Sequence, residues 1–509
     1  MSRALPKLRL RQLRWVVCAA ALPALWACNA RRLASPMGTP TTVEQNRFQQ
    51  SLNRKIDLLF MIDDSSSMTG LQTKLTTRFP DFIDTLDNVT GGRPDMHIAT
   101  ISSSLGAGIF GNVMGCMPGH PGNDEGSFQV PALCSMVHAG ERYLKASAVA
   151  GTNNFDGDLA AAFTCIASLG ATGCGFEHQF ASTQEALTRS LTKGDPNEGF
   201  LRPDAFLAVI MLTNEDDCSV PPTSMLFDPN QVSLSDPLGG LSGYRCNEFG
   251  HLCNGVQPPH VVSGPTTLNN CVSAEDAPSG QLVTVKDFTE FLYKLKPGEP
   301  GKILTAALAG PYVANAAMGQ PGAYTIAPTD FQLMSGATES QPVIGHSCVS
   351  ATPGDFADPG VRLVQWITET SGVFESICEN DFKPAMQQIA GIIGRKLGVP
   401  CVNGTVLDQN GAPWTDGDAS PPNCEISVRT YGTDGKPRDK VVDPCDHGTG
   451  NVGSVPCYRL TPDSAADPQC PAATGDHHVL DLCYDAGCTA AARPSDTASV
   501  GLSCALQTP

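Results

Sequence analysis

The chain has 509 residues, of which 41% are hydrophobic and 17% are charged, and its formal net charge is −18. This length allows two to four domains, and the composition is that of a globular protein and not of a disordered chain. The charge is acidic and no basic stretch follows the first residues, so we do not expect nucleic acid as a partner.

Residues 1–27 have the pattern of a signal peptide. Five basic residues precede a 13-residue apolar run, residues 15–27, which is too short to span a bilayer well. The run ends in Leu25-Trp26-Ala27-Cys28, which resembles a bacterial lipobox, whose Cys is lipidated. Trp26 stands where a small residue is usual, so a plain secretory signal is the alternative. We expect Cys28 to carry a lipid anchor, because several acyl chains on one Cys give stable membrane attachment.

Two further features concern the anchor. Asn29 follows the expected lipid site, whereas Asp at that position is the usual signal for retention at the inner membrane. This favours the outer membrane. Residues 28–50 contain Pro, Thr and Ser with little apolar content, which predicts a tether between the membrane and the folded chain. The alternative is that this segment is part of the fold.

A short apolar run, residues 56–62, has the length of a buried parallel strand and is followed directly by Asp63-x-Ser65-x-Ser67. In open parallel sheets, ligands bind at the carboxyl ends of the strands. One carboxylate and two hydroxyls form the hard oxygen set that Mg²⁺ prefers, with positions left for water or a ligand. The alternative is a Ser-rich turn without a ligand.

This apolar run, the Asp-x-Ser-x-Ser motif and Met68 after it resemble the metal-ion-dependent adhesion site of von Willebrand factor type A domains. The resemblance implies a Rossmann-like α/β domain, here residues 51–399. It also implies a divalent ion, Mg²⁺ or else Ca²⁺ or Mn²⁺, held by Asp63, Ser65 and Ser67. The expected partner is a protein that presents an acidic group to this ion.

The remaining strands and helices of residues 51–399 alternate along the chain, which predicts a parallel sheet covered by helices. Apolar runs predict strands at residues 96–102, 206–212 and 303–309. Apolar periodicity predicts helices at residues 69–86, 157–169, 176–191, 285–295, 361–369 and 382–397. Pro80 should kink or restart the first of these helices.

The type A pattern has two further positions, a Thr in a loop before a helix and an Asp after the central strand. Thr172 and Glu177 are both candidates for the first position, although Glu177 can also be an acid favoured by the helix dipole. Asn214 occupies the second position and lacks the charge, which Glu215, Asp216 or Asp217 could restore. We expect Thr172 to join the site and Asn214 or Asp216 to hold a coordinated water. The alternative is a solvated acidic turn.

Three long irregular stretches, residues 103–156, 214–284 and 310–358, follow strands. In a parallel sheet these exits lie at the same edge as Asp63, together with many of the cysteines. Long loops on a rigid scaffold commonly carry binding sites. The alternative is that they only thicken the domain.

The cysteines indicate disulfides. There are 20, and 18 remain when Cys18 of the signal and Cys28 are set aside, an even number typical of an oxidising compartment. Cys165 and Cys174 are close enough in sequence to pair. Residues 400–509 hold eight cysteines and short apolar runs at 425–428, 479–483 and 500–506. We predict a small β-rich module there, with cysteines that pair among themselves, and we read Asp476-His477-His478 as surface and not as a metal site.

Enzyme motifs are missing from the sequence. Gly345-His346-Ser347-Cys348-Val349 departs from a nucleophile elbow at its last position. The segments at 174–177 (CGFE) and 215–219 (EDDCS) are similar to lipoproteins of Gram-negative bacteria with a type A domain and a Cys-rich tail. We therefore predict a non-enzymatic, surface-anchored lipoprotein that binds a protein partner through its metal. The alternatives are a structural or envelope-assembly lipoprotein without a metal, and a hydrolase hidden in the inserts.

Overall fold

The computed structural model describes residues 41–44, 50–51, 54–88, 93–147, 151–312, 322–333, 336–397, 401–415, 420–431, 437–445, 456–462, 477–483 and 499–507. The expected signal peptide and the lipid site Cys28 lie outside these residues. Within the described part of the chain, no helix combines the length and the apolar character needed to cross a membrane.

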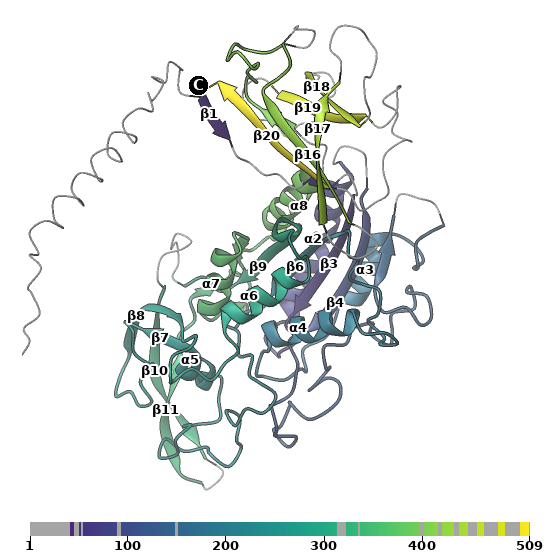
Figure 1. Ribbon diagram of the computed structural model, residues 1–509. Coiled ribbons are helices and arrows are strands. Elements are labelled where there is room, and N and C mark those ends of the chain that lie inside the picture. The colour runs from purple at the N-terminus through teal and green to yellow at the C-terminus, as the bar shows by residue number, and fades with distance from the viewer. Residues whose placement is uncertain are drawn as a thin grey trace, which may run out of the picture.

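A six-stranded sheet in the order β14-β9-β6-β3-β4-β5 forms the centre of the α/β domain (Figure 1). The strands are β3 Lys55–Ile62, β4 Asp95–Ser102, β5 Leu144–Ala146, β6 Phe206–Leu212, β9 Ile303–Ala309 and β14 Val373–Ser376. Neighbouring strands are parallel except for β5, which pairs antiparallel with β4 at one edge. In chain order the strands run from β3 outward to β5, and then from β6 outward to β14. This is the doubly wound arrangement, and its switch point lies between β3 and β6.

The four strands predicted from apolar runs are confirmed. Their side chains are apolar because helices cover both faces of the parallel sheet. Every residue of β6 is buried, and in β3 all but Lys55 are buried. The edge strands β5 and β14 were not predicted, because three or four residues are too few to show an apolar run.

Helices cover both faces of the sheet (Figure 1). Helices α2 Thr69–Asp87, α3 Leu159–Ala167 and α8 Lys383–Leu397 pack on one face, where the rings of Phe79 and Phe163 stack with centroids 3.6 Å apart. Helices α4 Gln179–Ser190, α6 Val285–Lys294 and α7 Val361–Glu369 pack on the other face, around Phe180, Phe288 and Trp366. These are the predicted helices, with ends shifted by up to three residues. Helix α2 continues through Pro80, so it does not restart there.

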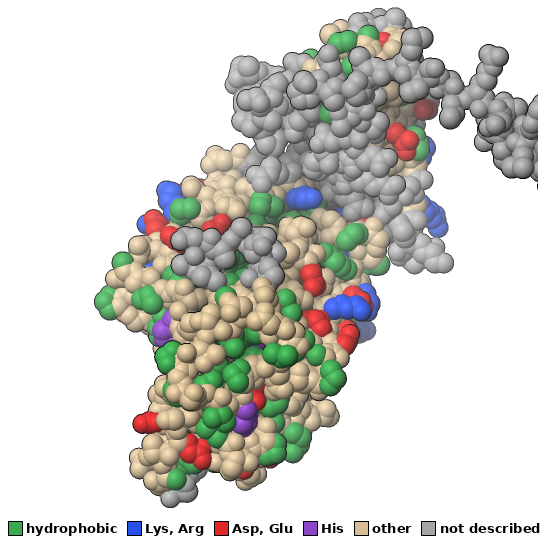
Figure 2. Space-filling view, turned by 90° about the vertical axis from the view of Figure 1, so that its left-hand side faces the viewer, with side chains coloured by type: hydrophobic (Ala, Val, Ile, Leu, Met, Phe, Trp, Pro, Cys, Tyr) green, Lys and Arg blue, Asp and Glu red, His purple; other side chains and the backbone are tan. Residues whose placement is uncertain are grey.

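The inserts contain more regular structure than the sequence indicated, which corrects the prediction of irregular stretches. Helix α5 Tyr244–Gly250 precedes a four-stranded antiparallel sheet, β11-β10-β8-β7. Its strands are β7 His251–Cys253, β8 Thr266–Ser273, β10 Gly322–Gln332 and β11 Thr338–Ile344, and a short pair follows, β12 Cys348–Val349 and β13 Phe356–Ala357. The strands are mainly polar and bury a few apolar side chains, such as Leu268 and Ile326, on one side only. The face in Figure 2 carries this sheet in its lower half, and few charged side chains appear there.

The C-terminal segment is β-rich, as predicted. Its sheet has the order β1-β20-β16-β17-β18-β19-β15, with β2 also paired to β20. The strands are β1 Thr41–Glu44, β2 Gln50–Ser51, β15 Cys401–Asn403, β16 Cys424–Tyr431, β17 Pro437–Pro444, β18 Cys457–Pro462, β19 His477–Cys483 and β20 Ser499–Gln507. Figure 1 shows these strands at the end of the six-stranded sheet opposite to the inserts.

Two sequence expectations need correction in this segment. Strand β1 and the first residue of β2 fall in the predicted tether, yet both strands pair with β20, because extended polar residues can add to an open strand edge. His478 was expected on a surface turn, but it lies in β19 and is buried near Trp414. Asp476 lies outside the described residues.

Three disulfides, Cys116–Cys174, Cys134–Cys165 and Cys348–Cys378, join the first and third inserts to the sheet domain, and two more, Cys218–Cys246 and Cys253–Cys271, close loops within the second insert. The predicted Cys165–Cys174 pair is therefore wrong, because the first insert folds back over α3 and over the loop before α4, and reaches both cysteines. Within the C-terminal segment, Cys424–Cys504 and Cys445–Cys457 are internal pairs, as predicted.

Candidate metal centre

Asp63 lies immediately after β3, at the switch point of the sheet. Its N–H donates to Leu212 O of β6 at 2.9 Å, and its carbonyl oxygen accepts a hydrogen bond from Gln72 Nε2 of α2, also at 2.9 Å. The backbone of Asp63 is thus held by the two central strands and by the helix that follows. This is the place where a doubly wound sheet offers its ligand site.

The carboxylate of Asp63 is fully buried and accepts two strong hydrogen bonds. Ser65 N donates to Oδ1 at 2.8 Å, and Thr213 Oγ1 donates to Oδ2 at 2.7 Å. Burial raises the pKa of Asp63, while the hydrogen bonds from Ser65 and Thr213 lower it. Thr213 was not predicted as part of the site, although its place directly after the central strand could have indicated it.

Three neutral oxygens follow one another beside this carboxylate. Ser65 Oγ lies 3.4 Å from Ser67 Oγ, and Ser67 Oγ lies 3.2 Å from Asn214 Oδ1. Neighbouring ligands of an octahedral Mg²⁺ at 2.0–2.1 Å lie about 3 Å apart, and those of Ca²⁺ lie somewhat farther apart. The three oxygens therefore have a spacing that suits adjacent positions around one divalent ion.

Two further carboxyl groups lie near Asp63, those of the buried Glu177 and the half-buried Glu215. Burial, and then the charges of Glu215 and Asp63, raise the pKa of Glu177 well above its usual range. Burial and the charge of Asp63 raise the pKa of Glu215 to about 8. Glu177 Oε1 is buried and has no hydrogen-bond partner among the residues that the structure describes. Buried carboxylates are costly without a compensating cation, so this donor set fits a hard divalent ion.

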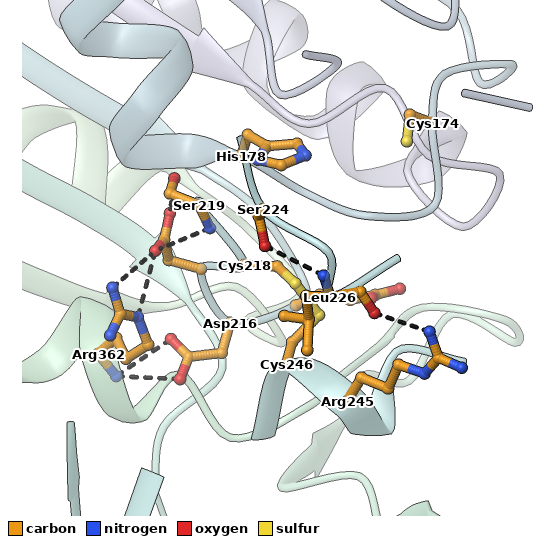
Figure 3. The surroundings of a disulfide bond; sticks show 12 residues. Cys174, His178, Asp216, Cys218, Ser219, Ser224, Leu226, Arg245, Cys246 and Arg362 are labelled. Carbon is orange, nitrogen blue, oxygen red and sulfur yellow. Dashed lines mark hydrogen bonds and ion pairs between the residues drawn. A yellow bond between two sulfur atoms is a disulfide. The ribbon is translucent and has the colours of Figure 1, made fainter. Parts of the chain in front are cut away.

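Thr172 and Asp216 do not take the positions expected of them. The side chain of Thr172 is exposed, and its hydroxyl makes no hydrogen bond to the site within the described ranges. Asp216 accepts hydrogen bonds from His251 Nε2 at 2.8 Å and from the backbone N–H groups of Arg362 and Leu363 at the start of α7. In Figure 3 its carboxylate faces Arg362. Asp216 therefore caps α7, because acidic groups are favoured at a helix N-terminus, and it is not available to the metal site.

The carboxylate of the next residue, Asp217, is also engaged in hydrogen bonds away from Asp63. It accepts hydrogen bonds from the side chain of Arg362 and from Phe180 N at the start of α4. Arg362 is itself buried and donates to Ser273 Oγ of β8 at 2.7 Å. Of the acidic run after the central strand, only Glu215 is thus turned toward Asp63.

All three inserts reach this edge of the sheet, as predicted. Ser104 of the first insert donates to Asp64 Oδ1 at 2.9 Å, and Asn214 begins the second. Asn214 Nδ2 donates to Phe356 O of the third at 3.0 Å. Gly173 packs so closely on the site that a Cβ there would lie 2.3 Å from Asp64 Oδ1. The site is therefore framed by loops held by disulfides.

A second cluster of potential metal ligands does not form a metal site. Among the described residues, Cys445, Cys457 and Cys483 are the one group of three His, Cys, Asp or Glu ligand atoms within 4.8 Å of one another. All three are disulfide-bonded and so are not free thiolates. The carboxyl groups of Asp63, Glu177 and Glu215 are not grouped within this distance.

No protein-family model matches this chain, and no curated protein matches it. Among solved structures, it is similar to a von Willebrand factor type A protein from Catenulispora acidiphila, with 9% identity and a TM-score of 0.29 over 92% of this chain and 65% of that one. The pilus adhesin SpaC from Lactobacillus rhamnosus GG has 10% identity and a TM-score of 0.31, and the match covers 90% of this chain and 40% of SpaC. The type V pilus tip protein Mfa5 from Porphyromonas gingivalis has 10% identity and a TM-score of 0.23, and the match covers 90% of this chain and 62% of the Mfa5 chain. The chain thus spans less than two thirds of each of these solved chains.

The class of the domain follows from its own topology. The doubly wound order of the sheet and the Asp-x-Ser-x-Ser motif at the carboxyl end of β3 agree with what the resemblance implies. The chain therefore contains an α/β domain of the von Willebrand factor type A fold, with disulfide-bonded inserts and a Cys-rich β segment after it.

Proposed function

We propose that this chain is a surface adhesion protein that binds an acidic group of a protein partner through one divalent ion. The ion, Mg²⁺ or else Mn²⁺ or Ca²⁺, is held by Asp63, Ser65 and Ser67, with Asn214 as a ligand or as the holder of a bound water. The observation that carries the proposal is the spacing of Ser65 Oγ, Ser67 Oγ and Asn214 Oδ1, 3.4 and 3.2 Å, beside a buried carboxylate.

An acidic partner follows from the charge of these ligands. Asp63 supplies a carboxylate, whereas both hydroxyls and the Asn214 amide are neutral. The ion therefore keeps more positive charge than it would beside a second carboxylate at position 214. Such an ion has open positions and attracts a hard anionic oxygen, and the carboxylate of an Asp or Glu side chain is the group of this kind that proteins present.

Secretion and anchoring complete the proposal. The disulfides agree with an oxidising compartment, and the leader ends at Cys28, which we propose as the site of a lipid anchor in the outer membrane. We propose no enzymatic activity, because the groups around Asp63 are ligands and hydrogen-bond partners with no activated nucleophile beside them.

A second candidate function is a metal-free structural or envelope-assembly protein. It is favoured by the hydrogen bonds of Asn214, whose Nδ2 donates to Ser67 Oγ and to Phe356 O, both at 3.0 Å. These bonds satisfy the amide without an ion.

Capture of partners from an envelope extract distinguishes the two functions. Immobilised wild-type protein should retain a partner in Mg²⁺ and release it in EDTA, and the Ser65→Ala and Ser67→Ala variants should not retain it. A partner that is retained equally in Mg²⁺ and in EDTA, and by all variants, contradicts the metal-dependent mechanism and supports the metal-free one.

A further inference from the structure

A cavity lies on the α4 side of the candidate metal centre. It has a volume of about 590 Å³ and lies between α4, the first insert and the start of the second insert. Pockets of 300–1,000 Å³ are the usual size for small-molecule sites. Leu105 and Val220 contribute an apolar wall, and the polar wall comes from α4 and from the loop at Glu125.

The one guanidinium in the lining is already neutralised. Arg189 Nε donates to Asp195 Oδ2 at 3.0 Å, and Arg189 Nη1 donates to Glu125 O at 2.6 Å and to Ser127 Oγ at 3.0 Å. The first of the two Nη1 bonds holds the backbone of Glu125, which has a φ of 52°. Arg189 thus stabilises the loop that forms one wall of the cavity, and the carboxylate of Asp195 offsets the charge of its guanidinium.

Two carboxylates in the lining have no such partner. Within the described part of the chain, the side chains of Glu125 and Glu185 make no hydrogen bond and no ion pair, yet both line the cavity. The hydroxyls of Thr188 and Thr192 donate to carbonyl oxygens of the preceding turn, which leaves their lone pairs as acceptors. The open polar groups of the α4 wall therefore accept hydrogen bonds and carry negative charge.

A buried histidine adds a further unused acceptor. His178 also lines the cavity, is 1% exposed, and bonds Gly106 O through Nε2 at 3.0 Å. That bond places the ring proton on Nε2, because a carbonyl oxygen can only accept. Nδ1 is then an acceptor, and it has no partner among the described residues. A buried unpaired acceptor is costly and indicates a missing donor.

We propose that this cavity is a second binding site, for an organic cation that consists of an ammonium or guanidinium group on a short apolar stem. The cationic head lies at Glu125 and Glu185, which gain a charge-assisted hydrogen-bond donor, and the stem lies against Leu105 and Val220. The site is independent of the metal. Its ligand is either a free amine or guanidine, or a basic side chain of a protein partner.

The test uses two probes of equal shape, n-butylguanidinium and the uncharged n-butylurea, titrated calorimetrically into the full chain with excess EDTA. The cation should bind about tenfold more tightly than the urea, and more weakly as salt is raised. Glu125→Gln and Glu185→Gln should each weaken the binding of the cation about fivefold or more. The matched control Glu290→Gln, an exposed carboxylate on α6 outside the cavity, should leave the affinity unchanged.

Equal affinity for the two probes, or Glu185→Gln binding the cation as the wild type does, overturns the proposal. The Asp63→Ala variant should still bind n-butylguanidinium, so a failure of the metal site and a failure of this site give different results. The peptide acetyl-Gly-Arg-Gly-amide identifies the source of the cation. A peptide affinity about tenfold above that of n-butylguanidinium supports a partner's side chain, and equal affinities support a free small cation.

Discussion

Thr213 Oγ1 donates to Asp63 Oδ2 at 2.7 Å, and through this bond the residues that follow the two central strands are joined at the proposed metal centre. The same hydroxyl also lies 3.0 Å from Gln179 Nε2 of α4. Thr213 is therefore a positioning residue, because it orients the carboxylate without being placed as a ligand itself. Partners of this kind set the geometry of metal ligands.

Replacing this hydroxyl should weaken metal binding. We expect Thr213→Val to lower the affinity for Mn²⁺ about tenfold or more, since partners that orient a ligand contribute on this scale. The free energy of unfolding should fall by about 1–2 kcal/mol, because the buried Asp63 loses a hydrogen bond. Calorimetry and urea unfolding measure the two effects. Thr188→Val, on the exposed side of α4, is the control, and equal Mn²⁺ affinity in both variants would show that Thr213 does not position Asp63.

Arg362 should be among the most sensitive positions for stability. It is buried, pairs with Asp217 at 3.1 Å and bonds Ser273 of β8, so it joins the inserted sheet to α7 and α4. Arg362→Met leaves the charge of Asp217 buried and unpaired, which should cost about 3–5 kcal/mol in urea unfolding. The double variant Arg362→Met/Asp217→Asn should recover a large part of this loss. No recovery in the double variant would mean that packing, and not the ion pair, explains the cost.

Acid should destabilise the fold through His97. Its Nδ1 donates to Phe200 O at 2.8 Å, and burial, together with the nearby charge of Arg202, lowers the pKa of His97 to about 4. The unfolded chain takes up this proton near pH 6.5 and the folded chain near pH 4. The stability contributed by neutral His97 is therefore present above pH 6.5 and is lost as the pH falls to 4, by up to about 3 kcal/mol.

The variant His97→Gln isolates this contribution. Asp57, whose pKa burial raises to about 6, has the opposite pH dependence, but it is present in both proteins. The difference in unfolding free energy between the wild type and His97→Gln should therefore shrink between pH 6.5 and pH 4. A difference that is constant over this range would show that His97 titrates normally in the folded state.

The disulfides of the first insert should support the site. Cys116–Cys174 holds the insert against the loop in which Gly173 N donates to Asp64 O at 2.9 Å. The double variant Cys116→Ser/Cys174→Ser should lose about 2–4 kcal/mol of stability. Peptide mapping without reduction should yield linked fragments for Cys116–Cys174 and for Cys134–Cys165. A fragment that links Cys165 to Cys174 would contradict the structure.

The sequence predicted the elements with long apolar patterns and missed those without them. The apolar runs of β3, β4, β6 and β9 and the periodicity of the helices indicate buried faces directly, so a parallel sheet covered by helices could be inferred. Strands β5 and β14 are short, and β8 and β10 are largely polar, so they become strands only through partners distant in the sequence. The disulfide pairing of Cys165 and Cys174 was missed for the same reason.

The structure brings together only some of the residues that the sequence placed in the metal site, and the site itself stays a prediction. Asp63, Ser65, Ser67 and Asn214 come together because the motif and the next central strand end at the same edge of the sheet. Thr172 and Asp216 were assigned to the metal site only because of their positions in the sequence, Thr172 shortly before a predicted helix and Asp216 shortly after the predicted central strand. Those positions do not show that Asp216 turns away to cap α7 and pair with His251, a residue of the second insert.

Calorimetric titration of the full chain with Mg²⁺ and Mn²⁺ tests the central claim most directly. We expect one site in the wild type at millimolar metal or below, and an affinity at least tenfold lower in Ser65→Ala and Ser67→Ala, because each variant removes one ligand. The circular dichroism of both Ser variants should equal that of the wild type, which separates loss of the ion from loss of the fold. No binding to the wild type at millimolar metal, or equal affinity in the wild type and both Ser variants, would contradict a metal centre at Asp63.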